Sequence, residues 1–186
     1  VMNTDIVTGI SDAATDGLNL VFTTDVGKAY LTDRMGVAPE LVDQLRHFGF
    51  SSICNMLAAI KTAKQLDLGH DDVVISVATD GSELYVSEKD QLLATDYPDG
   101  FTDLDAAAIV AQHLSGADTE HLEELDHVGR NRIFNLGYYT WVEQQGVSVE
   151  DFDGRRDQSF WDHLHTMAPG WDAMIEEFNA ATGVTI

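Results

Sequence analysis

The sequence predicts an α/β protein in which a helix leads into a strand of a parallel sheet, followed by a mostly helical tail. Three observations support this expectation. Residues 50–66 repeat apolar side chains at helical spacing. Residues 73–78 (VVISVA) form a nearly continuous β-branched run, which is typical of a strand covered on both faces. Residues 103–183 carry helical patterns almost throughout.

The first part of the chain supplies short elements and two helices. Residues 1–24 contain two brief apolar alternations, which we interpret as extended segments or loops. A helical pattern begins at Asp25 and stops at Gly36. Pro39 suits the first turn of a second helix, and Gly49 is expected to end it.

The central helix and strand are the best defined of these elements. Ser51 or Ser52 is a suitable N-cap, and Gly69 is expected to end the helix. The apolar face of this helix contains Ile53, Met56, Leu57, Ile60 and Ala63, with Lys61 on the opposite side or at its edge. One strong strand cannot form a stable sheet by itself, so we expect its neighbouring strands to come mostly from elsewhere, as in a fragment of a longer protein.

The tail is predicted as a series of helices. The first begins at Asp103 or Asp105 and ends at Gly116. A longer helix is expected over residues 118–136, and short helices are expected around residues 160–161 and 171–178.

The chain is strongly acidic. Thirty-two acidic residues against ten basic ones give a net charge of −22. Nucleic acid is therefore a poor partner, because phosphate binding requires clustered Lys and Arg. The carboxylates are dispersed, which favours a halophilic protein whose self-repulsion is screened by salt; the alternative is a protein that is merely acidic.

Other features bear on the compartment. No apolar run approaches the roughly 20 residues that span a bilayer, so no membrane partner is expected. The N-terminal residues lack the pattern of a signal peptide. The single Cys54 excludes an intramolecular disulfide and fits a reducing, cytoplasmic compartment.

Two segments form the candidate site. Thr79, Asp80 and Gly81 follow the carboxyl end of the predicted strand, where ligands bind in open α/β sheets. Gly49 and Ser51 lie at a helix N-terminus, whose free amides can meet a polar or anionic group. The alternative is purely structural, with Ser51 as a cap and residues 79–81 as a turn, and the pattern alone favours it. The histidine spacings favour no metal site, and no nucleophile elbow or glycine-rich phosphate loop is present.

Residues 49–85 resemble the C-terminal part of pyridoxal-phosphate (PLP) enzymes of the tryptophan-synthase-β and cysteine-synthase superfamily, known as fold type II. The matching features are Gly49-Phe50-Ser51-Ser52, Ala58-Ala59-Ile60-Lys61, the run from Val73 to Ala78, Thr79-Asp80-Gly81 and Tyr85. Residues 130–146 (RNRIFNLGYYTWVEQQG) are similar to the helical tail of a cysteine-synthase-like subgroup. Ile53 departs from the family pattern, which has a second glycine at that position.

The resemblance implies a lyase or transferase that uses PLP for β-replacement or β-elimination on a small amino-acid substrate. Gly49 and Ser51 would line the cofactor, and Thr79 or Asp80 would meet its pyridine nitrogen. Residues 1–90 would be the C-terminal part of the PLP-binding α/β domain, and residues 91–186 a helical extension packed on it.

The family's Schiff-base lysine and phosphate loop belong to its N-terminal half, and neither is found in this sequence. The chain alone is therefore expected to be an inactive fragment with no catalytic residue of its own. A homodimer is one candidate assembly. The alternative function is an autonomous acidic helical module that binds a protein partner without catalysis.

Overall fold

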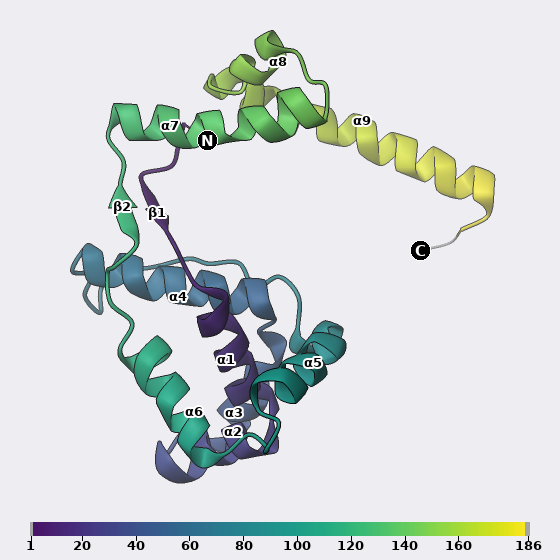
Figure 1. The fold of residues 1–186 in the computed structure, drawn as a ribbon. Coiled ribbons are helices and arrows are strands. Elements are labelled where there is room, and N and C mark those ends of the chain that lie inside the picture. The colour runs from purple at the N-terminus through teal and green to yellow at the C-terminus, as the bar shows by residue number, and fades with distance from the viewer. Residues whose placement is uncertain (1, 185–186) are drawn as a thin grey trace. The chain divides into compact units, whose positions relative to one another are not determined.

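The computed structural model describes residues 2–184, which are mostly helical and divide into two compact units (Figure 1). The main unit comprises residues 6–123. The second unit comprises residues 2–5 together with residues 124–184.

The main unit contains two short strands, a set of α-helices and four short helical segments. In chain order its elements are β1 (Ile6–Thr8), α1 (Asp12–Thr23), α2 (Asp25–Ala29), η1 (Tyr30–Arg34), α3 (Pro39–Gln44), η2 (Leu45–His47), α4 (Phe50–Gln65), η3 (Ser82–Tyr85), α5 (Val86–Asp96), α6 (Asp103–Ile109), η4 (Val110–Ser115) and β2 (Leu122–Glu124). Of the short segments, η1 and η4 are π-helical, and η2 and η3 are 3-10 helical. Strands β1 and β2 pair antiparallel and form a two-stranded sheet.

Helix α1 is the centre of the core of the main unit. It packs against α4 and α6. Its buried apolar side chains are Ala14, Leu18, Leu20, Val21 and Phe22. The expectation of loops or extended segments over residues 1–24 is therefore wrong for residues 12–23. Gly17 and Asn19 have low helix propensity, but tertiary packing accommodates both, since Gly17 lies against Ile109 and the Asn19 amide donates to the Ser82 hydroxyl.

Three predicted helices of the main unit are confirmed. The pattern from Asp25 to Gly36 forms α2 and η1, and Gly36 ends it with a left-handed φ of 69°. Pro39 occupies the first turn of α3. The pattern over residues 50–66 forms α4, which buries Ile53 and Leu57 in the core.

The predicted fold class is wrong. The described residues contain only two short antiparallel strands, and they do not form the parallel-sheet α/β unit of fold type II. Residues 73–78 form no strand, and their side chains lie in solvent, with Val73 81% and Ile75 89% exposed. A β-branched run becomes a strand only where neighbouring strands accept its backbone hydrogen bonds, and no described segment pairs with it.

The second unit is helical. Its elements are α7 (His127–Tyr138), η5 (Tyr139–Gln144), α8 (Val149–Gly154) and α9 (Gln158–Thr182). The long helix expected over residues 118–136 is wrong in its first part, because residues 122–124 form β2. The two short helices expected after residue 158 are one continuous helix, α9, which contains Pro169.

Aromatic and cationic side chains hold the second unit together. The Phe134 and Phe152 rings pack with centroids 4.7 Å apart. The Arg156 guanidinium lies 4.0 Å from the centre of the Phe134 ring, and Arg155 lies over Trp141 at 4.8 Å. Helix α9 contributes no buried residue; Phe160 and Leu164 are half-buried, and its later apolar side chains, such as Trp171 and Phe178, are exposed.

Among the helices described, none combines the length and the apolar character that crossing a membrane requires.

Candidate functional site

The two segments predicted to form a site meet in the main unit. The Gly49 N–H, just before α4, donates a hydrogen bond of 2.8 Å to the Asp80 carbonyl. The Ser52 hydroxyl accepts a hydrogen bond of 2.9 Å from the Thr79 N–H and lies 3.4 Å from the Asp80 carbonyl. The beginning of α4 and the turn at residues 79–81 therefore form one polar corner, which we call the α4 corner.

Gly49 permits this close approach. A Cβ atom at this position would lie 2.6 Å from the Asp80 carbonyl oxygen and 2.9 Å from Cε2 of Tyr85. Both distances are shorter than real Cβ contacts allow, so a side chain here would push the turn away from the helix. The glycine is needed for space and not for an unusual backbone angle, because its φ is −77°.

The α4 corner leaves polar groups accessible. Ser51, Thr79 and Asp80 are exposed, whereas Gly49 and Ser52 are buried. No side chain caps the N-terminus of α4 in the described structure. Amides in the first turn of a helix have no partner within the helix, so they can bind a polar or anionic ligand group.

The Asp80 carboxylate has a partner within the corner. The Tyr85 hydroxyl donates a hydrogen bond of 3.1 Å to Asp80 Oδ2, and this bond is the main cause that raises the pKa of Tyr85 above its ordinary value. The Tyr85 ring in turn packs edge-on against Phe50, with centroids 4.9 Å apart. Asp80 is thus oriented toward Tyr85, while no such contact holds the Thr79 side chain.

Polar side chains behind the corner hold the turn in place, a role that their sequence positions do not predict. The Ser82 hydroxyl donates to the Phe48 carbonyl at 2.7 Å and accepts a buried hydrogen bond of 3.1 Å from the Asn19 amide. The Asn55 amide donates to the Val77 carbonyl at 3.0 Å. One signal could have revealed them: Asn19 is a polar residue between two leucines of a buried segment, where polar side chains need partners.

Ser52 has a role that the sequence pattern does not predict. The pattern predicts Ser51 or Ser52 as the N-cap of α4, but Gly49 occupies that position, and Ser52 holds Thr79 and Asp80 from the buried side of the helix. Asn55 follows three residues later on the same face of the helix. Two polar residues at this spacing on an otherwise apolar face indicate a segment that packs there through its backbone.

The α4 corner supplies some of the groups that a PLP site requires. Its exposed hydroxyls and carboxylate, on Ser51, Thr79 and Asp80, are of the kind that can hydrogen-bond to a pyridine nitrogen. The corner lacks the lysine that would bind PLP covalently, because none of the four lysines contacts it in the described structure. Lys28 pairs with Asp43 at 3.7 Å, Lys61 pairs with Asp118 at 3.7 Å, Lys64 donates to the Ala117 carbonyl, and Lys89 lies on α5.

Within residues 2–184, no three His, Cys, Asp or Glu side chains gather closely enough to hold a metal ion. Comparisons of the chain with models of protein families, with curated proteins and with solved structures find no match.

Proposed function

We propose that this chain supplies the ring-nitrogen side of the cofactor site in a PLP-dependent enzyme that performs β-replacement or β-elimination on a small amino acid. The observation that supports the proposal is the α4 corner, where Gly49 and Ser52 meet Thr79 and Asp80. These are the segments that resemble the cysteine-synthase superfamily. The proposal concerns the chemistry of the site, since the parallel-sheet fold is not present in the described residues.

Each residue of the corner has a distinct part in this proposal. When bound, PLP supplies the electron sink that stabilises a carbanion of the substrate. Ser52 holds the Thr79 backbone, so the Thr79 hydroxyl is the neutral group that meets the ring nitrogen. Asp80 is held by Tyr85 and serves the turn instead. Ser51 and the first amides of α4 line the ring from the other side.

The chain alone is inactive in this proposal, because no lysine lies at the corner. In the assembled enzyme, the Schiff-base lysine and the phosphate-binding loop come from polypeptide outside this sequence. The acidic, dispersed charge supports a halophilic source for this enzyme, and the single Cys54 supports a reducing, cytoplasmic compartment.

A titration followed by amide NMR tests the proposal. On addition of PLP to the isolated chain, the amide signals of residues 49–52 and 79–81 should shift. Borohydride reduction should label the four lysines sparsely, as in ordinary surface reaction. Shifts that avoid the corner would contradict the assignment, and one stoichiometrically labelled lysine would contradict the statement that the anchoring lysine is elsewhere.

Helix α9 favours a second candidate function, that of an acidic module which binds a protein partner without catalysis. This helix spans 25 residues and buries none of them, and Phe178 is 65% exposed. Exposed apolar side chains along one helix are typical of a surface that binds another protein. The coding sequence upstream separates the two candidates: a reading frame that continues into a strand, a lysine and a glycine-rich loop supports the enzyme, whereas a nearby start codon supports the module.

A further inference from the structure

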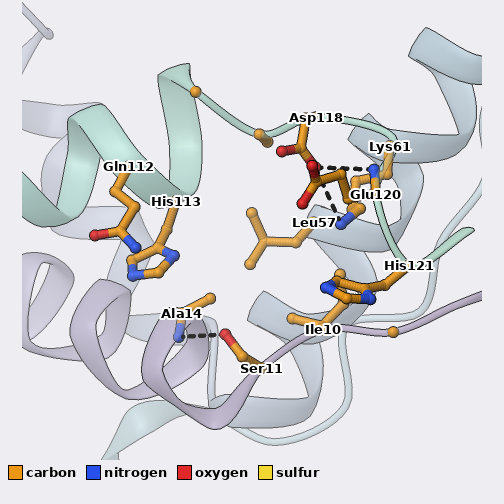
Figure 2. A pocket seen from close by; sticks show the side chains of 13 residues that line it. Ile10, Ser11, Ala14, Leu57, Lys61, Gln112, His113, Asp118, Glu120 and His121 are labelled. Carbon is orange, nitrogen blue, oxygen red and sulfur yellow. Dashed lines mark hydrogen bonds and ion pairs between the residues drawn. The ribbon is translucent and has the colours of Figure 1, made fainter.

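A second polar cavity lies in the main unit, away from the α4 corner. It has a volume of about 270 Å³, is partly open to solvent, and is lined by the start of α1, the second half of α4, η4 and the segment that leads to β2 (Figure 2). Lys61 lies on its wall, nine residues after Ser52. At about 1.5 Å per residue, this places it about 14 Å from the α4 corner along the helix. We call this space the Lys61 cavity.

Lys61 is the most unusual residue of the cavity. The sequence places it on the outside of α4 or at its edge, but in the structure it is only 9% exposed. In the described part of the chain its polar partner is Asp118, whose Oδ1 lies 3.7 Å from Lys61 Nζ. An ion pair of that length is not a hydrogen bond, and an ammonium group has three donors. The Lys61 ammonium is not among the buried atoms that lack a partner, because it reaches the cavity, where water or a ligand can supply the acceptors that Asp118 does not.

Carboxylates lie beside this ammonium. Asp118 Oδ1 accepts a hydrogen bond of 2.9 Å from the Glu120 backbone N–H, which fixes the position of the Asp118 side chain. Figure 2 shows the Glu120 side chain close to the same place. Asp118 is 59% exposed on its side chain, so it reaches both the cavity and the solvent. One wall of the cavity therefore presents a cation and two carboxylates side by side.

Two histidines complete the polar lining. His113, on η4, and His121, before β2, lie on opposite sides of the cavity in Figure 2. Burial lowers the pKa of His113, so its ring is neutral near pH 7 and offers one donor and one acceptor. Between them, Leu57, Ala14 and Ile10 form an apolar floor.

We propose that the Lys61 cavity binds a small free α-amino acid. The ligand carboxylate bonds to Lys61, and its ammonium group bonds to Asp118 and Glu120. A simple anion would be repelled by the two carboxylates, and a simple cation would leave the Lys61 ammonium without an acceptor, whereas a zwitterion matches both kinds of group. The volume lies just below the range of about 300–1,000 Å³ that holds drug-sized ligands, which suits a ligand with a short side chain against the apolar floor. This inference does not depend on the proposed PLP chemistry.

The test is a titration of the whole chain with L-alanine, acetate and methylammonium, followed by amide and histidine NMR signals. Alanine should shift His113, His121 and their neighbours without shifting residues 49–52 or 79–81. Acetate and methylammonium should each bind at least about tenfold more weakly than alanine. Acetate can bond only to Lys61, and methylammonium can bond only to Asp118 and Glu120. Acetate binding as tightly as alanine would overturn the assignment to a zwitterion, and absence of alanine binding at about 10 mM would overturn the site.

Variants assign the binding to named side chains. Lys61→Met keeps an unbranched side chain that is one atom shorter, removes the ammonium group, and should weaken alanine binding about tenfold or more. Lys28→Met is the matched control, because Lys28 also forms a 3.7 Å ion pair in the main unit but lies outside the cavity, and it should bind alanine normally. If Lys61→Met does not fold, Asp118→Asn changes an exposed carboxylate and should show the same loss. Unchanged binding in a folded Lys61→Met or in Asp118→Asn contradicts the proposal.

Discussion

Replacing Gly49 with alanine tests the geometry of the α4 corner directly. The added Cβ would lie 2.6 Å from the Asp80 carbonyl oxygen and 2.9 Å from the Tyr85 ring. The carbonyl belongs to the backbone and cannot rotate away as a flexible side chain could. The turn at residues 79–81 must therefore move, and the hydrogen bond from the residue 49 N–H to Asp80 lengthens or breaks.

The expected change in the free energy of unfolding combines two costs and one gain. Forcing an extra carbon into a packed site costs about 1–3 kcal/mol, and the weakened hydrogen bond costs about 1 kcal/mol. Alanine is compatible with the backbone angles of Gly49 (φ −77°, ψ −178°) and restricts the unfolded chain, which returns about 0.4–1 kcal/mol. The net loss in the free energy of unfolding should be about 1–3 kcal/mol.

Urea denaturation measures this loss as a lower midpoint at an unchanged slope. Gly69→Ala is the matched control, because the nearest atom to its added Cβ is 3.9 Å away and Gly69 does not have a positive φ. That variant should be neutral or slightly stabilising. Equal midpoints for Gly49→Ala and Gly69→Ala would refute the close approach of Asp80 to α4.

Three further predictions follow from charge and from the site. Thermal stability should rise from low to molar potassium chloride, because the Debye length falls from about 10 Å at 0.1 M to about 3 Å at 1 M; a flat or falling melting temperature contradicts the halophilic interpretation. In the PLP titration, Thr79→Ala should reduce binding more than Asp80→Asn, and the opposite order reverses the assignment of the ring-nitrogen partner. Since burial lowers the pKa of His113 in the folded state, its contribution to stability is complete above the unfolded value of about 6.5 and is lost as the pH falls below it. Urea unfolding measures the free energy of unfolding at pH 7.5 and at pH 5.5, about one unit on either side of 6.5. Between these two values the free energy should fall less in His113→Gln than in the unchanged chain.

The sequence by itself determined those features that depend on neighbouring residues. The apolar repeat over residues 50–66 predicts α4, because a helix forms its hydrogen bonds within one segment. Gly36 ends η1 in the left-handed region that glycine tolerates. The candidate segments at residues 49–51 and 79–80 were also found in the sequence, and the structure brings them together through backbone hydrogen bonds.

Features that depend on distant partners could not be predicted in this way. Residues 73–78 have the composition of a buried strand, but strand formation requires neighbouring strands that the described residues do not supply. Helix α1 contains Gly17 and Asn19, which have low helix propensity, and their packing against Ile109 and Ser82 could not be predicted from neighbouring residues.

The tertiary structure alone decided which side chains face the sites. Ser51 and Ser52 are adjacent and chemically identical, yet only Ser52 turns toward Thr79 and Asp80. Lys61 is a charged residue that the sequence places outside, but the packing of α4 against its neighbours turns it toward a cavity lined by Asp118. Successive residues of a helix point about 100° apart, and only the elements packed around the helix determine which direction becomes the interior.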